Sequence, residues 1–542
     1  MQRSTLLALV FRIGLALMTR TFFQPDEFFQ SLEVAHRLVF GYGHLTWEWL
    51  SPNPIRGIIY PALNVPIYWG LKLLHLDHTD LLIWAPKVLH GALAACTDIW
   101  LCELARRVAG ERYVFTALYL SLTSVFHGLS LSRSMSNSLE TSLTTIALCF
   151  FPWDASQDIK INAYILVRDE IRKMLFFAAL ACVVRPTNAL LWVYMMSALL
   201  WRLRRHPNHL TSLTAICYRS VTLLSTVALD SAYYGALTLT PLNFLRTNLS
   251  SVSLFYGSSP WHYYISQALP ILCSMALPYV LQGAWQAAHT TGLASKTMLS
   301  LVVWTIGVYS LAGHKEWRFI HPLLPLMHVL AAKAIVDTNP TRRGSSIFSK
   351  YYRQVVLLGL PAIVYVSVFH SRAQIDVMHY LRRLPSEEAH SVGFLVPCHS
   401  TPWQAYLHRP DLADPGRLWA LGCEPPLSGQ DVTVYQDQTD VFYASPANYL
   451  QTHFPRDVDP AFPPSEMPCT VPGAPTLPGL EWRHEWPQNL VVFGALLDDA
   501  EVRGILEEKE YREVWKSESG WEGDRRRQGG VRVWRVRPVE LE

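Results

Sequence analysis

The sequence predicts a polytopic α-helical membrane protein followed by a soluble α+β domain. Half of its 542 residues are hydrophobic and only 16% are charged, against about 25% in a typical soluble domain. Long apolar segments recur as far as residue 371 and then give way to charged residues, prolines and short alternating runs. We therefore expect a transmembrane module over residues 1–371 and a soluble carboxy-terminal domain over residues 372–542.

Eleven segments are apolar enough to be candidate membrane helices. They cover residues 4–22, 81–104, 113–132, 138–153, 174–187, 188–202, 214–238, 264–287, 297–312, 320–337 and 354–371. The first contains Arg12 and no signal-peptidase pattern, so we expect a retained helix rather than a cleaved signal peptide. Residues 58–76 are also apolar, but Pro61 and Pro66 interrupt them. An interfacial or re-entrant piece is expected there.

The distribution of basic residues predicts the orientation, because short cytoplasmic loops are enriched in Lys and Arg. With a cytosolic amino terminus, the clusters around Arg106, Arg202 and Arg342 all fall in the cytosol. The opposite, lumenal side then receives a first loop over residues 23–80 and the carboxy-terminal domain. In an oxidising lumen we expect a disulfide between Cys398 and Cys423, with Cys469 left over.

The carboxy-terminal domain contains four runs with the composition of strands. Prolines, glycines and other turn-forming residues separate them. They are VGFLVPCHS at 392–400, DVTVY at 431–435, DVFYAS at 440–445 and NLVVFGAL at 489–496.

A dense polar and aromatic run at residues 21–50 directly follows the first apolar segment. It carries adjacent carboxylates, Asp26 and Glu27, at the edge of the membrane. Ionisable groups beside a bilayer are costly and indicate function. A solvated loop with a helix-capping acid is the alternative.

Other polar and aromatic segments fall on the same lumenal face. They are TWEW at 46–49 with Arg56, SRSMSN at 132–137, RPTN at 185–188, YGSSPWHYY at 256–264 and HKEWRF at 314–319. A carboxylate can deprotonate a hydroxyl, and cations can hold an anionic leaving group. Aromatic side chains stack on sugars or line a lipid groove. The combination favours glycosyl transfer from a lipid-linked sugar phosphate.

The motifs PDEFFQSLEVAH, GHLTWEW, IRGIIYP, RPT and HKEWRFIHP together are similar to one family. They resemble the dolichyl-phosphate-mannose-dependent α-mannosyltransferases of glycosyltransferase family 22. The resemblance covers the whole chain, and departs at IRG, where a serine or threonine is expected after Arg56. It implies the GT-C fold. Together with the count of apolar segments, we expect a GT-C-like bundle of about 11 transmembrane helices.

Within that family the sequence is most similar to the enzymes that extend glycosylphosphatidylinositol (GPI). The resemblance implies an endoplasmic reticulum membrane enzyme with a lumenal active site. It would add the third, α-1,2-linked mannose to the GPI precursor, from dolichyl phosphate mannose, with inversion. Addition of the fourth GPI mannose, or α-mannosyl transfer to an N-glycan precursor, remain the alternatives.

Other classes of protein fit the sequence less well. No internal repeat of the kind found in transporters is present. The net charge is only +3, and no nucleic-acid-binding motif occurs, so a polynucleotide partner is excluded. Neither a cofactor nor a metal is expected, since His36 and His44 show no ligand spacing near the acidic pair.

The resemblance assigns the general base to Asp26, and Glu27 is expected to support it. The candidate ligands of the donor phosphate are His314, Lys315, Arg318, Arg185 and Arg133. The candidate substrate-binding residues are Glu48, Trp47, Arg56, His262, Trp261 and Glu316.

Several of these residues have ordinary structural alternatives. Arg133 and Arg185 fit equally well as helix ends whose side chains reach towards the interface. Trp47 and Trp261 are also typical of the aromatic belt at a membrane surface. Asn248 begins a glycosylation sequon, Asn-Leu-Ser.

Overall fold

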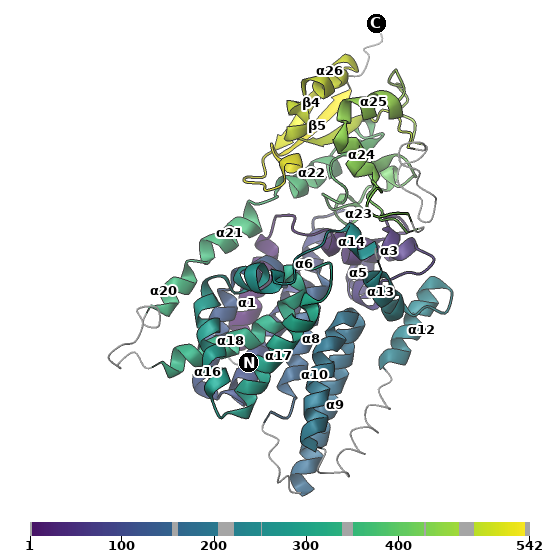
Figure 1. The fold of residues 1–542 in the computed structure, drawn as a ribbon. Coiled ribbons are helices and arrows are strands. Elements are labelled where there is room, and N and C mark those ends of the chain that lie inside the picture. Colours follow the sequence, from purple (N-terminus) through teal and green to yellow (C-terminus); the bar gives the residue numbers. More distant parts are fainter. Residues whose placement is uncertain are drawn as a thin grey trace.

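The computed structural model describes residues 3–153, 161–203, 222–250, 252–338, 351–427, 430–465 and 482–536. A body of helices forms the lower part of Figure 1, and a smaller domain built around a β-sheet lies above it. We call these parts the helical body, from α1 (Arg3–Met18) to α21 (Leu360–Val368), and the sheet domain, from α22 (Ala373–Arg382) to β5 (Val531–Val536). The order, helices first and then a mixed α+β part, is the one that the sequence predicts.

The helical body contains helices within all eleven predicted segments, although the segment 214–238 is described only from residue 222 onwards. Among the described residues, five helical stretches are long and apolar enough to cross a membrane. They are Leu81–Val108, Tyr264–His289, Leu293–Ser310, Trp317–Asp337 and Tyr352–Arg382. The number of helices that cross the membrane therefore stays a prediction.

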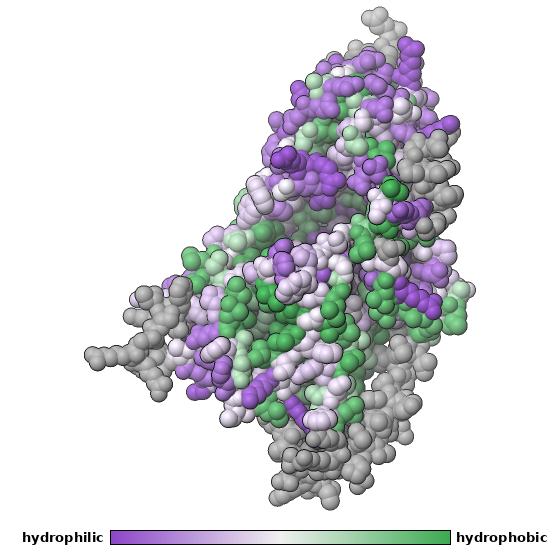
Figure 2. Space-filling model, in the orientation of Figure 1, coloured by the Kyte–Doolittle hydropathy of each residue, from purple (hydrophilic) through white to green (hydrophobic). Residues whose placement is uncertain are grey.

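Other helices of the body lie outside these five stretches. They include α1 (Arg3–Met18), α7 (Glu111–Leu122), α8 (Ser136–Cys149), α9 (Ile161–Val184), α10 (Ala189–Leu203), α12 (Thr222–Tyr234), α13 (Thr240–Leu249) and α14 (Val252–Phe255). The surface agrees with a membrane location, since apolar residues gather over the helical body and hydrophilic ones over the sheet domain (Figure 2). The protein is membrane-embedded.

A buried ion pair joins α1 to α6 (Leu81–Val108). Gly91 allows the two helices to approach closely, because a Cβ there would lie 2.8 Å from the Cα of Ile13. At this contact Arg12 Nε lies 2.7 Å from Asp98 Oδ2, and both side chains are fully buried. Ser121 Oγ donates to the other oxygen of Asp98 at 2.6 Å. The arginine that interrupts the first apolar segment is thus the partner of an aspartate within the bundle.

The apolar stretch at residues 58–76 is broken, as its prolines predict. It forms two short helices, α4 (Ile59–Ala62) and α5 (Val65–Leu73). Trp69 and Leu73 on α5 are exposed. Its position at a membrane interface stays a prediction.

The sheet domain has five strands in the order β2-β1-β3-β5-β4. They are β1 (Val392–Leu395), β2 (Leu418–Ala420), β3 (Asn489–Phe493), β4 (Tyr511–Ser517) and β5 (Val531–Val536). Strand β1 runs parallel to β2 and β3, whereas β5 is antiparallel to β3 and β4. Successive side chains of a strand point to opposite faces. Val491 accordingly packs in the core that includes α22 (Ala373–Arg382), and Val492 packs in the opposite core with α26 (Ala500–Glu508).

Two of the four strand predictions are confirmed and two are wrong. The runs 392–400 and 489–496 contain β1 and β3. The run 440–445 instead lies in α24 (Gln438–Ala444), because the Asp437 side chain accepts the N–H of Asp440 and caps the helix at 2.7 Å. The run 431–435 forms a turn in which Asp431 accepts the N–H of Thr433.

The disulfide predicted between Cys398 and Cys423 is present, with the two Cα atoms 5.9 Å apart. It links the segment after β1 to the segment after β2. Cys469 lies outside the described residues.

A buried carboxylate fixes the sheet domain to the first loop of the helical body. Glu33, at the start of α2 (Glu33–Phe40), accepts the backbone N–H groups of Ala405 at 2.7 Å and Gln404 at 3.2 Å. The N–H of His44 donates to the same carboxylate at 2.8 Å. Burial raises the pKa of Glu33 to about 7, although these hydrogen bonds oppose the rise. Helix α2 is therefore attached to the sheet domain through hydrogen bonds to Glu33.

Breaking the Arg12–Asp98 pair should destabilise the fold. We expect Arg12→Met or Asp98→Leu to cost about 3 kcal/mol or more, because each leaves one charge buried without its partner. The double variant should lose less than either single variant. Unfolding of the protein in detergent measures the difference. Arg106→Met is the control, since its ion pairs are partly exposed, and its cost should stay below about 1 kcal/mol.

Candidate active site

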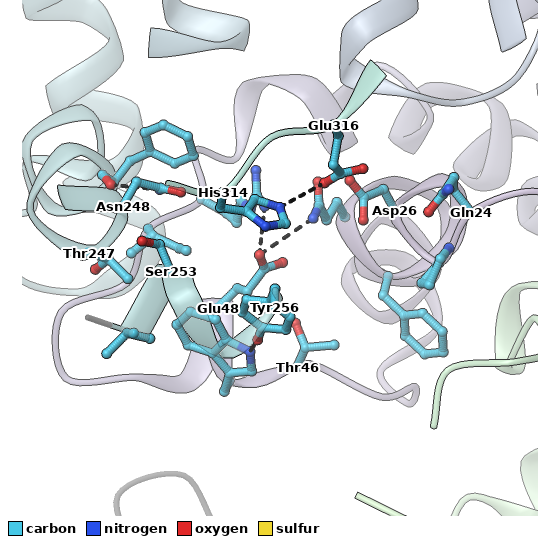
Figure 3. Close-up of a pocket in the computed structure, with 18 of the residues that line it drawn as sticks. Gln24, Asp26, Thr46, Glu48, Thr247, Asn248, Ser253, Tyr256, His314 and Glu316 are labelled. Carbon is cyan, nitrogen blue, oxygen red and sulfur yellow. Dashed lines mark hydrogen bonds and ion pairs between the residues drawn. The ribbon is translucent and has the colours of Figure 1, made fainter. Parts of the chain in front are cut away.

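A cavity of about 490 Å³ lies where the first loop, α13, α14 and the segment at 314–319 meet the sheet domain. Its polar lining is drawn in Figure 3. Asp26 and Glu316 lie side by side at one end, and Thr247, Asn248 and Ser253 lie at the other. Segments more than 280 residues apart in the chain thus contribute to one site.

Asp26 enters this cavity from the amino end of a helix. Pro25 precedes it, and the Pro25 carbonyl accepts the N–H groups of Phe28 and Phe29, both at 2.9 Å. The helix continues through η1 (Phe28–Leu32) into α2. A carboxylate at this end of a helix is favoured by the helix dipole, and the proline stiffens the approach to it.

Glu27 points away from the cavity, although it is adjacent to Asp26. Successive residues of a helix lie about 100° apart around its axis, so Glu27 faces the interior. There its Oε2 lies 3.1 Å from Arg133 Nη1, and both side chains are buried. Arg133 also donates to the carbonyls of Thr21 and Leu129. Glu27 and Arg133 therefore lie outside the cavity and join the helix to the bundle.

Arg318 holds two carboxylates of the cavity at once. Its Nη1 lies 2.7 Å from Asp26 Oδ2. Its Nε and Nη2 form a fork to Glu316, at 2.6 and 2.9 Å. Burial would raise the pKa of Glu316, but Arg318 and His314 hold it well below its usual range. Both acids are therefore fixed in place beside a permanent cation.

His314 extends this cluster on the other side of Glu316. Its Nε2 lies 3.4 Å from Glu316 Oε1, and its Nδ1 lies 3.0 Å from the carbonyl of Gly257. The hydrogen bond to Glu316 raises the pKa of His314 above the ordinary value of 6.5, although burial opposes the rise.

A second acid–base pair lies across the cavity. Arg56 Nη2 approaches Glu48 Oε1 at 2.6 Å. Gln30 Nε2 donates to the same oxygen at 3.4 Å, while the buried Gln30 Oε1 has no hydrogen-bond partner among the residues that the structure describes. The buried hydroxyl of Thr46, which also lines the cavity, likewise has no partner among them. Unpartnered buried polar groups are costly, so these two atoms are candidate contacts for a ligand.

Among the described lining residues, cations outnumber carboxylates. The described lining contains four cations, Arg56, Arg185, Lys315 and Arg318, and three carboxylates, Asp26, Glu48 and Glu316. His314 is not included in this count. Arg185 also forms an ion pair with Glu140, with its Nε 3.2 Å from Glu140 Oε2. Lys315 donates to the carbonyl of Ser259 at 2.7 Å and forms no ion pair within the described part of the chain. Lys315 is therefore the cation most available to an anionic ligand.

Aromatic side chains complete the walls. Trp47 Nε1 donates to the hydroxyl of Tyr256 at 3.0 Å, which fixes both rings. The guanidinium of Arg56 lies over the ring of Phe244, and that of Arg185 over the ring of Phe319. Such contacts hold the cations in place without using all of their N–H donors.

The structure brings most of the predicted residues together, but not all of them. The predicted residues that line the cavity are Asp26, Trp47, Glu48, Arg56, Arg185, His314, Lys315, Glu316 and Arg318. Trp261 and His262 lie outside it. Trp261 is 71% exposed, and His262 is exposed and bonded to Ser266 four residues on. Asn248 lines the end of the cavity farthest from Asp26, and its glycosylation stays a prediction.

Sequence reasoning missed several of the lining residues. Among them are Gln24, Phe29, Gln30, Thr46, Phe244, Tyr256 and His399. Gln30 could have been found, because it follows Asp26 by four residues and so shares its face of the helix. Tyr256 belongs to a segment that sequence reasoning did select. His399 lies in the predicted run 392–400 and follows Cys398, but neither signal indicated that it reaches the cavity from the sheet domain.

One group of potential metal ligands occurs within the described residues, formed by Cys398, His399 and Cys423. Both cysteines are consumed by the disulfide, so this group does not fit a metal. The arrangement instead combines a fixed carboxylate, an excess of cations and aromatic walls. It can deprotonate a hydroxyl and hold a phosphate in the same cavity.

A model of the Alg9-like mannosyltransferase family matches residues 4–408. The chain belongs to this family. The matched region contains every cavity residue predicted from the sequence. As an Alg9-like mannosyltransferase the protein is a glycosyltransferase.

Named relatives of this Alg9-like protein are similar over most of its length. A Yarrowia lipolytica protein, GPI mannosyltransferase 3, is 38% identical over 470 residues, which cover 84% of this chain and 86% of that protein. GPI alpha-1,2-mannosyltransferase 3 of Mus musculus is 34% identical, over 83% of this chain and 78% of the mouse protein. The human protein of the same name is 33% identical, over 83% and 77%.

The fold has a counterpart among solved structures. The crystal structure of ArnT from Cupriavidus metallidurans bound to undecaprenyl phosphate matches with a TM-score of 0.54 at 12% identity. The match covers 98% of this chain and 96% of ArnT. ArnT is a GT-C membrane glycosyltransferase, so the predicted GT-C fold is confirmed.

The raised pKa of His314 predicts a pH dependence. The imidazolium charge is present below that pKa and is lost as the pH rises through it, above 6.5. The KM for a lipid-linked sugar phosphate should therefore increase by up to about ten-fold as the pH is raised from about 6 to about 8. His314→Gln should flatten this profile, whereas His262→Gln, outside the cavity, should leave it unchanged. An unaltered profile in His314→Gln would contradict the prediction.

Proposed function

We propose that this protein transfers mannose from dolichyl phosphate mannose to the GPI precursor, as the third and α-1,2-linked mannose. The observation that carries the proposal is the cavity, in which a positioned carboxylate faces an excess of cations. The names of the fungal and mammalian relatives support the choice of acceptor. The reaction would take place in the endoplasmic reticulum membrane, with the cavity and the sheet domain in the lumen.

Asp26 is the general base in this mechanism. Its Oδ2 is held by Arg318, and the side chain is 17% exposed, so Oδ1 can receive a proton within the cavity. The acceptor hydroxyl attacks C1 of the donor mannose and passes its proton to Asp26. A new C1–O bond forms as the C1–O bond to phosphate breaks. One such displacement inverts the β-linkage of the donor into the α-linkage of the product.

Lys315 and the arginines of the cavity stabilise the leaving group. Dolichyl phosphate departs with the electron pair of the broken bond, and its negative charge increases in the transition state. Within the described residues Lys315 forms no ion pair with a carboxylate, so its charge is available to the phosphate. Arg56 and Arg185 have N–H groups beside aromatic rings. Arg318 is committed to Asp26 and Glu316, so its main effect is to hold the base in position.

Replacing the base should abolish transfer without unfolding the protein. Asp26→Asn keeps the shape of the side chain but removes its ability to take a proton, so we expect kcat to fall by about 100-fold or more. Donor binding should change little. Transfer of radiolabelled mannose in vesicles measures the loss. Asp414→Asn, on the exposed surface of the sheet domain, is the matched control. Near-normal turnover in Asp26→Asn would remove this residue from the base role.

The acceptor is tested by depleting the protein in its own cells. If it adds the third mannose, a GPI intermediate with two mannoses should accumulate. The lipid fraction, separated by thin-layer chromatography and identified by mass spectrometry, gives the answer. An intermediate with three mannoses would instead favour addition of the fourth. A truncated N-glycan precursor would contradict a role in GPI synthesis.

A further inference from the structure

The cavity has an uncharged wall, formed by side chains from both parts of the protein. Phe29 belongs to helix η1 of the helical body, and His399 belongs to the sheet domain. Both residues also line a small adjoining hollow, together with His44, Trp403 and Glu424. Among the described residues, neither lysine nor arginine lines this hollow. The wall therefore lies between the cavity, whose lining includes lysine and arginine, and the hollow, whose described lining includes neither.

Four rings lie against one another along this wall. The ring centroids of Phe29 and His399 are 4.5 Å apart, and those of Phe29 and His44 are 5.9 Å apart. His44 in turn lies 6.1 Å from Trp403. Aromatic surfaces with a few fixed polar atoms are typical of sites for small organic ligands.

His44 and His399 are both neutral near pH 7. Burial lowers the pKa of His44 to about 3 and that of His399 to about 4. A neutral imidazole offers one donor and one acceptor of hydrogen bonds. Such groups suit the hydroxyls of an uncharged sugar and give little attraction to a phosphate.

His399 is held in an uncommon conformation. Its φ angle is 52°, in the left-handed region that residues other than glycine seldom adopt. It directly follows Cys398, whose disulfide partner Cys423 lies with its Sγ 3.5 Å from His399 Nδ1. Backbone strain of this kind concentrates at functional sites. The disulfide thus fixes the imidazole that the sheet domain presents to the cavity.

We propose that the wall formed by Phe29 and His399 is the subsite for the acceptor, and that it binds the neutral hexose bearing the attacking hydroxyl. This inference rests on the proposed function. Phe29 follows Asp26 by three residues on one helix, so the two side chains share a face. The charge of Asp26 is also near enough to raise the pKa of His399, against the effect of burial. A hexose on this wall would place its hydroxyl beside the base.

The donor mannose is the other hexose in the reaction, and its position distinguishes the two sugars. It is bonded to phosphate and must lie near Lys315, Arg56 and Arg185. The wall of Phe29 and His399 carries no such cation. It therefore suits the sugar that has no attached charge.

The test compares His399→Ala with wild type, using the full chain in lipid nanodiscs. The substrates are dolichyl phosphate mannose and a synthetic GPI glycolipid with two mannoses. We expect the KM for the glycolipid to rise about ten-fold, while kcat at saturating glycolipid and the KM for the donor stay within about two-fold. Phe29→Leu, which keeps apolar volume and removes the ring, should shift the same constant. His390→Ala, an exposed histidine of the sheet domain, is the control and should change neither constant.

A direct binding measurement separates failure of this inference from failure of the proposed function. A soluble α-linked dimannoside should raise the unfolding temperature of wild type and of His390→Ala, but not that of His399→Ala. If wild type binds the dimannoside in this way yet transfers no mannose to the glycolipid, the proposed function is wrong and the sugar subsite stands. If transfer occurs but His399→Ala leaves the glycolipid KM unchanged, or raises the donor KM as much, the inference is wrong.

Discussion

The position of one helix, which runs from Asp26 to Phe40, determines how the parts of this protein meet. Three of its carboxylates face three different surroundings. Asp26 enters the cavity, Glu27 pairs with Arg133 inside the bundle, and Glu33 accepts backbone N–H groups of the sheet domain. Burial of a carboxylate is tolerated only where such partners exist. The helix can therefore occupy one position, and in that position Asp26 faces the site.

The charges of the cavity are organised in pairs with unequal roles. Arg318 is saturated by Asp26 and Glu316, so it contributes to the geometry of the acids. Lys315 donates to a carbonyl and is not paired with an acid in the described structure. The ion pair with Arg318 fixes the position of Asp26, and Lys315 can compensate the charge of a phosphate. This division explains how one small space can serve both proton transfer and departure of an anion.

The sheet domain contributes to the site as well as to the fold. Its attachment through Glu33 brings the segment after β1 over the cavity, and His399 is the residue that arrives there. The disulfide between Cys398 and Cys423 limits the movement of that segment. The cationic side of the cavity is formed by the helical body alone, whereas the uncharged wall requires both parts.

The sequence by itself determined the class of protein, the helical segments, the broken stretch at 58–76 and the catalytic candidate Asp26. These follow from local composition and from motifs, which are read along the chain. It also selected nine residues that line the cavity. Only the tertiary structure decided that Glu27 and Arg133 face the interior, that Arg12 pairs with Asp98, and that His399 rather than His262 reaches the site. The physical reason is that the pairing of buried charges and the docking of the sheet domain depend on contacts between distant segments. The local sequence does not specify which partner each side chain contacts.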